Sequence, residues 1–175
     1  GGFIMHTFQP YPINMLEWNP MEKIAKEWFV IATERDGKPN AMTAGWGGVG
    51  VLWGKNVAFI FVRDSRYTKE ILDDTENFSC SFLDPAEKGV KNTLKYLGMV
   101  SGRDEDKMAG ARLNMNHDMG IPFIDESKFV IVCKKLAAVP ITPDTILKDK
   151  ILDDWYKDGD YHTMYVGEIL DVLAR

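Results

Sequence analysis

Apolar residues occur along this chain in short runs whose length and spacing are typical of β-strands. Some runs are apolar throughout, as in a buried strand, and others alternate large apolar with small polar residues, as in a strand with one wetter face. Strands are predicted over residues 28–33, 40–46, 57–62, 77–83, 129–139 and 161–173. Asp36-Gly37 lies between the first two and has the composition of a hairpin turn, so these two strands are expected to pair.

Helical signals are shorter and fall between the predicted strands. Asn19-Pro20 supplies a cap and a first-turn proline for a short helix that ends near Lys26. Ile71 and Leu72 lie among charged residues, which predicts the inward side of a second short helix, after the strand 57–62.

Three later segments complete the pattern. Asp84-Pro85-Ala86-Glu87 combines a cap, a first-turn proline and a third-position glutamate, so it predicts a helix to about residue 97 with Leu94 and Leu97 facing the core. Ser101–Lys107 is predicted as a turn that leads into another helix, with acidic residues in its first turn. Residues 114–127 are predicted as loop.

Strands therefore dominate, in hairpin-like succession, without regular strand–helix alternation or an internal repeat. This order predicts a mainly β fold, a closed antiparallel barrel with peripheral helices. A chain of 175 residues can form one core, and no linker rich in proline, glycine or serine divides it. We expect a single domain over residues 1–175, with residues 1–15 as an extended N-terminal arm.

Composition and charge argue against several classes of protein. Hydrophobic residues make up 45% and charged residues 27% of the chain, which is the usage of a folded globular protein. The formal net charge of −5 argues against nucleic-acid binding, which depends on clustered lysine and arginine. The apolar runs are too short to span a bilayer, and no N-terminal secretion signal is recognised. A cytoplasmic protein without a membrane role is expected.

The cysteines and histidines give no sign of a metal site. Cys80 and Cys133 lie in apolar, strand-like segments, where reduced thiols act as small core hydrophobes; a disulfide or a metal role is the alternative. The histidines at positions 6, 117 and 162 lack the spacing of zinc ligands. No metal is expected.

The segment Phe61–Thr68 ends one strand and opens a helix, and it carries two arginines and two hydroxyl side chains. A helix start has unpaired N–H groups and partial positive charge, and arginine offers paired donors that match phosphate oxygens. The candidate phosphate ligands are Arg63, Ser65, Arg66 and Thr68. In the structural alternative, a hydroxyl caps the helix and the arginines form surface ion pairs with Asp64, Glu70 or Asp73.

The segment Met42–Gly50 has four glycines within six residues, directly after a predicted strand. Main-chain groups that lack side-chain cover let a flat ligand approach closely, with Thr43 and Trp46 offering a hydroxyl and an aromatic wall. The alternative is structural, because glycines at strand ends also form bulges and barrel corners. The spacing is not G-x-G-x-x-G and no strand–turn–helix unit surrounds it, so a dinucleotide-binding Rossmann motif is not indicated.

Three segments occur in an order that resembles a known family. They are Asn40–Gly48, Phe61–Thr68 and Ser101–Lys107. Together they resemble the flavin reductase-like FMN-binding family, and within it the flavoredoxin-like branch. The resemblance extends to the strand around Cys133 and to His162–Ile169, so it covers nearly all of the chain after the first fifteen or so residues. Two positions depart from the family pattern: Gly45 stands where relatives commonly have serine, and Asp64 where they commonly have proline.

The resemblance implies a split β-barrel, antiparallel and Greek-key-like, usually a homodimer with FMN at or near the subunit interface. It implies that the isoalloxazine and ribityl region is lined by Met42, Thr43, Ala44, Gly45 and Trp46. It implies that the phosphate is held by Arg63, Ser65, Arg66 and Thr68, and that the site is completed by Ser101, Gly102 and Lys107. His162 is the candidate catalytic residue, facing the exposed side of the ring; the alternative is a satisfied strand histidine.

Three functions follow as hypotheses. The first is an NAD(P)H-dependent oxidoreductase that exchanges two electrons with flavin, and the second is a non-enzymatic FMN-binding electron carrier that a partner protein reduces. The third is a small β-barrel interaction module with surface ion pairs. Hydride transfer is the flavin's own chemistry and needs no catalytic base, which fits a chain without a recognisable Ser/His/Asp or Cys/His set.

Overall fold

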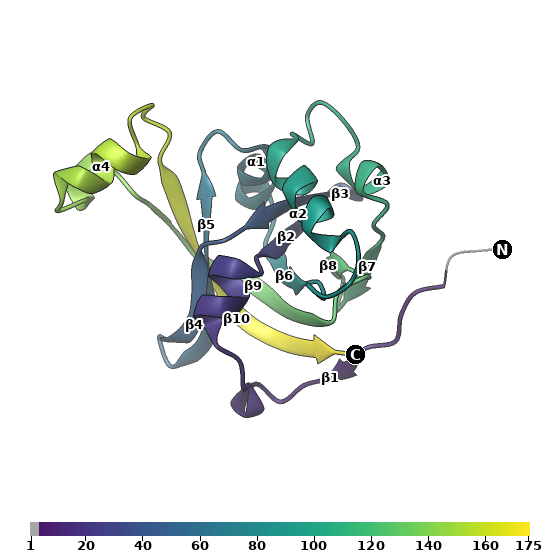
Figure 1. Ribbon diagram of the computed structural model, residues 1–175. Helices are drawn as coiled ribbons and strands as arrows, with labels where there is room; N and C mark the ends of the chain where they lie inside the picture. The colour runs from purple at the N-terminus through teal and green to yellow at the C-terminus, as the bar shows by residue number, and fades with distance from the viewer. Residues whose placement is uncertain (1–3) are drawn as a thin grey trace.

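Eight antiparallel strands form one curved sheet in the computed structural model, which describes residues 4–175 (Figure 1). The order along the sheet is β3-β2-β6-β9-β10-β5-β4, and β1 pairs with the end of β10. The strands are β1 (Gln9–Pro10), β2 (Phe29–Arg35), β3 (Lys38–Ala44), β4 (Gly47–Leu52), β5 (Lys55–Arg63), β6 (Asn77–Phe82), β9 (Phe129–Pro140) and β10 (His162–Ala174). A separate hairpin joins β7 (Met115–Asp118) to β8 (Ile121–Ile124).

The barrel is split between its two edge strands, β3 and β4, which follow each other in the chain. Only Gly45 and Trp46 connect them, yet within residues 4–175 β3 pairs with β2 alone and β4 with β5 alone. The mainly β split-barrel fold is thus confirmed, but the expectation of a closed hydrogen-bonded circuit is wrong. The chain passes from one edge to the other without a hairpin, so the main-chain groups along both edges have no strand partner in the described residues.

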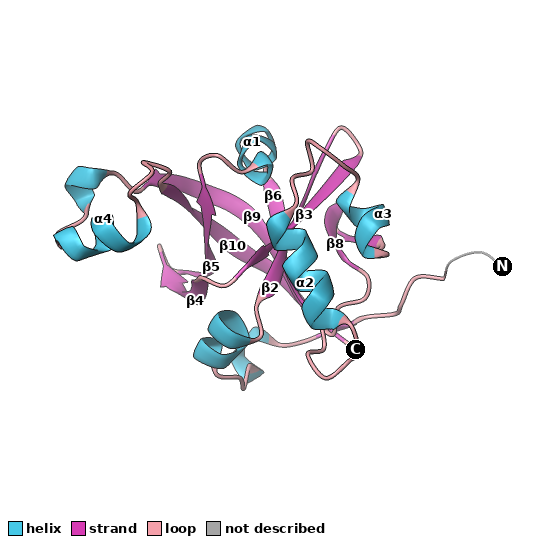
Figure 2. Ribbon diagram, turned by 45° about the horizontal axis from the view of Figure 1, so that its top comes forward, coloured by secondary structure: helices cyan, strands magenta, loops and turns pink. Residues whose placement is uncertain are grey.

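Helices are arranged around the sheet (Figure 2). They are α1 (Tyr67–Asp74), α2 (Val90–Met99), α3 (Lys107–Ala111), α4 (Asp149–Trp155) and a short π-helix, Met21–Lys26. One-turn 3₁₀ segments cover Ile13–Met15 and Pro143–Thr145. α2 lies over β2 and β3, while α4 projects away from the body beyond the ends of β9 and β10.

Among residues 4–175 the buried hydrophobic residues form three clusters, and strand periodicity separates the two that contain residues of β2. Phe29 and Ile31 of β2 face a cluster inside the curve of the sheet, which also contains Tyr165. Val30 and Ala32 point to the other face, where Leu94 and Leu97 of α2 cover them, as predicted for these two leucines. Because successive strand residues point to opposite faces, a strand that is buried on both sides is apolar throughout. All the predicted strands and the helix after Arg66 are confirmed.

The two cysteines are free and buried, Cys80 in β6 and Cys133 in β9. Burial raises the pKa of the Cys80 thiol to about 12, so the thiol stays protonated and packs as an apolar group.

The glycine-rich segment forms a further strand that was not predicted, and the helix predicted from Asp84 begins later than expected. Residues 47–52 are strand β4, and glycine is needed at Gly47 because a Cβ there would come within 2.6 Å of the Phe59 carbonyl oxygen. The helix predicted from Asp84 begins only at Val90, after Gly89 with φ 85°. The Asp84 carboxylate accepts from the Ala86 N–H at 2.9 Å, which makes a local turn instead of a helix cap.

Two further predictions are corrected between residues 101 and 127. Residues 114–127, predicted as loop, contain the β7–β8 hairpin, whose turn places Met119 at φ 54° and Gly120 at φ 77°. All four residues of β8 are buried, so its short sequence carries no polar alternation that reveals a strand. The acidic residues before α3 precede its first turn, where Asp106 caps the helix by accepting from the Ala109 N–H at 3.1 Å.

The N-terminal stretch is attached to the rest of the domain from His6 onward, while residues 1–3 of the predicted arm lie outside the described part. β1 pairs with the last residues of β10. The His6 main-chain N–H donates to the fully buried Asp125 carboxylate at 3.0 Å, and its ring nitrogen Nδ1 lies 2.7 Å from the other oxygen. The short helix at residue 21 is confirmed, since the Asn19 side chain accepts from the Met21 N–H at 2.9 Å.

Candidate functional site

Two cavities meet at Arg66, near the split of the barrel. The first, of about 270 Å³, is called the aromatic cavity; it is lined by Met42, Thr43, Ala44, Gly45, Trp46, Phe61, Arg63, Arg66, Gly98, Trp155 and His162. The second, of about 210 Å³, is called the cationic cavity; it is lined by Asn40, Ser65, Arg66, Tyr67, Thr68, Met99, Val100, Ser101, Gly102, Arg103 and Lys107. Every residue predicted for the flavin site lines one of these two cavities.

The fold brings the two cavities together because the strand and helix ends converge there. β3 ends at Ala44, β5 ends at Arg63 and leads into α1, and the turn after α2 carries Ser101 and Gly102. The segments that carry the three sequence motifs are therefore neighbours in space.

Arg66 and Lys107 are two partly desolvated cations beside the cationic cavity. The Lys107 side chain is buried, and its Nζ donates to the Leu97 carbonyl at 2.8 Å, which uses one of three donors. Burial and the positive charge of Arg66 lower the pKa of Lys107 to about 8. Burial also lowers the pKa of Arg66, whose guanidinium donates no hydrogen bond to any of the described residues. An anion between them would relieve the repulsion and use the spare donors.

Hydroxyl groups and a glycine contribute to the rest of the cationic cavity. The Thr68 hydroxyl accepts from the Asn40 amide at 2.8 Å, so its own hydrogen is left for another acceptor. Gly102 permits the close approach of its neighbours, because a Cβ there would lie 2.2 Å from Asn40 Oδ1 and 2.9 Å from the Tyr67 ring. Any side chain at this position would push Asn40 or Tyr67 into the cavity.

The edge of β3 gives the aromatic cavity its main-chain wall. Among the described strands β3 pairs with β2 alone, so alternate N–H and C=O groups of β3 point away from β2, toward the split. The Thr43 hydroxyl is already in use, since it donates to the Leu94 carbonyl and ties β3 to α2. Thr43 therefore contributes its main chain and its shape to the cavity, not the free hydroxyl that the sequence suggested.

Aromatic rings cover the other side of the aromatic cavity. The Trp46 ring centroid lies 4.9 Å from those of Trp155 and His162. His162 is 6% exposed, and its Nδ1 lies 2.8 Å from the Tyr156 hydroxyl. Burial, with the nearby positive charge of Arg63, lowers the pKa of His162 to about 4. Its imidazole is therefore neutral near pH 7 and does not serve there as a proton donor of the imidazolium type.

The sequence family agrees with this geometry. Residues 21–175 match the family model described as flavin reductase like domain. The chain belongs to this family. No curated protein matches it in sequence.

Solved structures share the fold of this flavin reductase-like domain. Flavoredoxin from Methanosarcina acetivorans has TM-score 0.66 and 21% identity, covering 85% of this chain and 68% of that one. Flavoredoxin of Desulfovibrio vulgaris (Miyazaki F) has TM-score 0.64 and 21% identity, covering 100% and 74%. The NADH:FAD oxidoreductase of Streptomyces globisporus C-1027 has TM-score 0.61 and 17% identity, covering 85% and 75%. At identities this low the likeness shows the shared fold alone.

Both departures from the family pattern have structural explanations in this flavin reductase-like domain. A Cβ on Gly45 would lie 3.1 Å from Cδ1 of Trp28, a tight contact, so a serine there would require the Trp28 indole to move by a few tenths of an ångström. Asp64 points away from the cationic cavity, because its Oδ1 accepts from the Thr163 hydroxyl at 2.8 Å. The Asp64 N–H also donates to the Tyr161 carbonyl at 2.8 Å, a bond that proline cannot make.

Two predicted phosphate ligands have other partners in the flavin reductase-like domain. Arg63 lines the aromatic cavity and donates to the carbonyls of Asp160, at 2.6 Å, and Trp155, at 3.3 Å. Ser65 donates both its N–H, at 3.1 Å, and its hydroxyl, at 2.5 Å, to the Asp160 carboxylate. The surface ion pairs of the structural alternative do not form, because Glu70 pairs with Arg103, Asp73 with Lys69, and Asp64 with Thr163.

Several lining residues of the flavin reductase-like domain were missed from the sequence. They are Phe61, Gly98 and Trp155 in the aromatic cavity, and Asn40, Tyr67, Met99, Val100 and Arg103 in the cationic cavity. Four of these residues lie inside the three motif segments and could have been predicted as part of the site: Asn40, Phe61, Tyr67 and Arg103. No sequence pattern indicated Trp155, because it reaches the site from α4, which lies far along the chain from the motifs.

Residues 4–175 contain no group of three or more histidine, cysteine, aspartate or glutamate side chains placed to hold a metal ion. In the same part of the chain, no helix is both long and apolar enough to cross a membrane.

Proposed function

We propose that this domain binds FMN and exchanges two electrons between NAD(P)H and the flavin, as an oxidoreductase of the flavin reductase-like family. The observation that carries the proposal is the pair Arg66 and Lys107: a half-buried arginine and a buried lysine, neither with an acidic hydrogen-bond partner among the described residues, beside a cavity at a helix start. A phosphate group supplies the charge and the acceptors that these side chains lack.

The remaining parts of FMN fit the same site by their chemistry. The phosphate would lie in the cationic cavity between Arg66 and Lys107, with the hydroxyls of Thr68 and Ser101 as further donors. The flat ring would lie in the aromatic cavity, against the free edge of β3 and between Phe61 and the indole of Trp46. Arg66 lines both cavities, so one ligand with a ring at one end and a phosphate at the other can span them.

The bound flavin would supply the hydride chemistry, and the side chains would bind and orient it. Trp46 and Trp155, whose ring centroids lie 4.9 Å apart, would cover one side of the ring position. Neutral His162 holds the Tyr156 hydroxyl at 2.8 Å and keeps a second positive charge away from the ring beside Arg63. His162 is proposed as a positioning residue that fixes this wall; the proposal needs no catalytic base.

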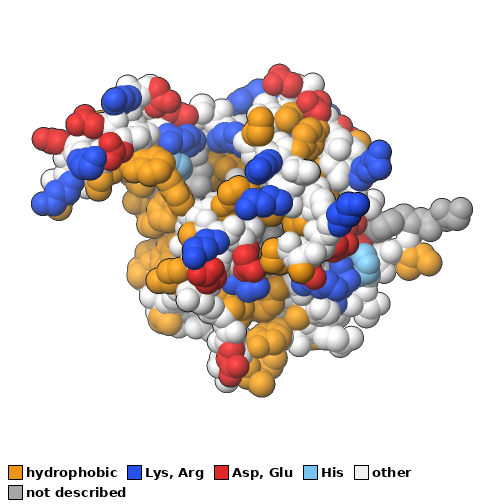
Figure 3. Space-filling view, viewed as in Figure 1, with side chains coloured by type: hydrophobic (Ala, Val, Ile, Leu, Met, Phe, Trp, Pro, Cys, Tyr) orange, Lys and Arg blue, Asp and Glu red, His pale blue; other side chains and the backbone are white. Residues whose placement is uncertain are grey.

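We further propose that the protein is a homodimer that pairs along β4. The outer edge of β4 lacks a strand partner in the described residues, and Val51 and Trp53 beside it are exposed. An apolar cavity of about 420 Å³ lies between β4 and the π-helix at Met21–Lys26. Figure 3 shows hydrophobic side chains gathered on the side of the molecule where Figure 1 places β4. An exposed edge with apolar neighbours is a surface that a second copy can cover.

Two measurements test the activity. Titration of the purified protein with FMN, followed by flavin fluorescence, is expected to show one bound FMN per chain. Anaerobic stopped-flow mixing of the FMN complex with NADH or NADPH is then expected to bleach the flavin absorption rapidly. Absence of FMN binding would overturn the proposal. Binding without bleaching by either nicotinamide would favour the electron carrier that a protein partner reduces.

A further inference from the structure

The carboxylate of Asp160 lies on the predicted phosphate loop. Its Oδ1 accepts from the Ser65 N–H at 3.1 Å and its Oδ2 from the Ser65 hydroxyl at 2.5 Å. Asp160 comes from the segment between α4 and β10, 95 residues further along the chain. A carboxylate that accepts from adjacent main-chain and hydroxyl donors resembles a bound phosphate in both charge and geometry.

Ser65 has no donor left for a ligand while this contact exists. An N–H and a hydroxyl each carry one hydrogen, and Asp160 accepts both. Ser65 lines the cationic cavity, so a phosphate in that cavity can bond to it only after the Asp160 carboxylate withdraws. The negative charge of Asp160 also acts on Arg66, the cation shared by the two cavities.

The carboxylate can withdraw without opening the surrounding segment. Arg63 holds the main chain of that segment by its bonds to the carbonyls of Trp155 and Asp160. The Asp160 N–H donates to the Asp158 carboxylate at 3.1 Å, and the Asp64 N–H donates to the Tyr161 carbonyl. A rotation of the Asp160 side chain therefore frees Ser65 while α4 and the contact between Trp46 and Trp155 stay in place.

We propose that Asp160 sets the affinity of the site by competing with the flavin phosphate for Ser65, which keeps the flavin exchangeable between turnovers. The inference rests on the proposed function, because it takes the ligand to be FMN. An internal anion raises the free energy of the bound complex in which it is displaced, and so shortens the residence of the flavin. A site built in this way suits a flavin that is released as a product.

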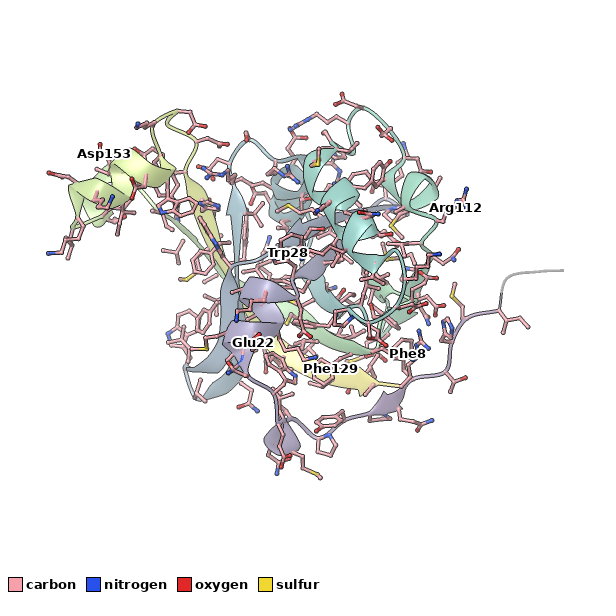
Figure 4. The ribbon with its side chains drawn as sticks, in the orientation of Figure 1. Phe8, Glu22, Trp28, Arg112, Phe129 and Asp153 are labelled. Atoms are coloured by element: carbon pink, nitrogen blue, oxygen red, sulfur yellow. The ribbon has the colours of Figure 1, made fainter. Side chains whose placement is uncertain are left out.

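The test is Asp160→Asn, measured by equilibrium titration and by stopped-flow dissociation with both FMN and riboflavin. The amide keeps the shape but removes the negative charge, so the dissociation constant for FMN is expected to fall about tenfold, with a similar fall in dissociation rate. Riboflavin has no phosphate and its affinity is expected to stay unchanged. Asp153→Asn is the matched control, since Asp153 lies on the outer part of α4, away from the sheet (Figure 4).

A second background separates a contact at Ser65 from a general effect of charge. In Ser65→Ala the gain from Asp160→Asn is expected to shrink markedly, because the contested donor is gone. An undiminished gain there, an equal gain for riboflavin, or unchanged FMN binding in Asp160→Asn would each overturn the inference while leaving FMN binding intact. Failure of the wild-type protein to bind FMN would overturn the proposed function, and this inference with it.

Discussion

At the scale of single residues, burial sets the charge state of the groups around the two cavities. It lowers the pKa of Lys107 to about 8 and that of His162 to about 4, with opposite consequences at neutral pH. Lys107 remains mostly charged and adds to the field of Arg66, while His162 is neutral. The cationic cavity is therefore positive, and the aromatic cavity carries positive charge through Arg63 and the shared Arg66, with His162 neutral.

Arg66→Ala is expected to weaken FMN binding by about 1 to 3 kcal/mol, because charged hydrogen bonds to the phosphate are lost. Riboflavin binding is expected to change little. Fluorescence titration with both ligands measures the difference, and Lys88→Ala, at an exposed lysine outside both cavities, is the control. Unchanged FMN affinity would remove Arg66 from the site.

Asp118 gives a prediction about pH. Burial and the neighbouring Asp171 carboxyl raise the pKa of Asp118 to about 6 from 3.8, so the folded state holds this proton more tightly than the unfolded chain. The stabilisation is complete below pH 3.8 and is lost as pH rises through 6. Asp118→Asn is therefore expected to raise the melting temperature at pH 8 but hardly at pH 4. Melting curves across this range measure it, with Asp153→Asn as control, and a gain that is the same at both pH values would contradict the assignment.

At the scale of elements, the site depends on close approach between the ends of strands and helices. The turn after α2 passes so close to Asn40 of β3 and Tyr67 of α1 that only glycine fits at position 102. A hydrogen bond also joins two of these elements: the Thr43 hydroxyl of β3 donates to the Leu94 carbonyl of α2. These contacts fix the walls of both cavities before any ligand enters.

Gly102→Ala is expected to destabilise the fold by about 1 to 3 kcal/mol, because the added methyl group overlaps Asn40 and Tyr67. It is also expected to weaken FMN binding by narrowing the cationic cavity. Urea unfolding and FMN titration measure the two effects. Gly50→Ala in β4 is the control, since its Cβ would meet the Phe59 ring at an ordinary 3.7 Å. Equal stability of the two variants would show that Asn40 and Tyr67 can shift to admit the methyl group, and it would contradict the requirement for glycine at position 102.

At the scale of the whole molecule, the split between β3 and β4 determines both the site and the exposed surface. The same interruption leaves the edge of β3 free to meet a flat ligand and the edge of β4 free to meet another chain. α4 lies beyond the sheet and still contributes Trp155 to the aromatic cavity. The proposed ligand site and the proposed interface surface would therefore be two consequences of one unclosed barrel.

Val51→Lys is expected to shift the protein from dimer to monomer, because it places a charge beside the unpaired edge of β4. Sedimentation velocity at several protein concentrations measures the change. Leu147→Lys, at an 88% exposed position in the segment before α4, controls for the added charge itself. A monomeric wild-type protein, or an unaltered dimer in Val51→Lys, would rule out pairing along β4.

The local sequence pattern determined which segments became strands and where the ligand chemistry lies. Alternation and apolar runs in the sequence predict β2, β3, β5, β6, β9 and β10. Successive residues of a strand point to opposite faces of the sheet, so the burial of each face is visible in the local sequence. The three motif segments likewise hold Arg66, Ser101 and Lys107 close to their own strand and helix ends. The local pattern gave wrong predictions in two places. At Asp84 the side chain forms a local turn instead of capping a helix, and in the β7–β8 hairpin β8 is buried at all four residues and shows no polar alternation.

Only the tertiary structure decided which of these groups are free to bind. Arg63 and Ser65 carry phosphate-binding chemistry in the sequence, but Asp160 and Trp155, more than 90 residues further along the chain, take up their donors. The negative charge of Asp64 does not enter the cationic cavity, because its carboxylate accepts a hydrogen bond from the Thr163 hydroxyl and points away. Contacts between residues so far apart in the sequence depend on the curvature of the sheet and on which strands form its edges. Sequence fixes what each side chain can donate or accept, while topology determines whether a partner has already used it.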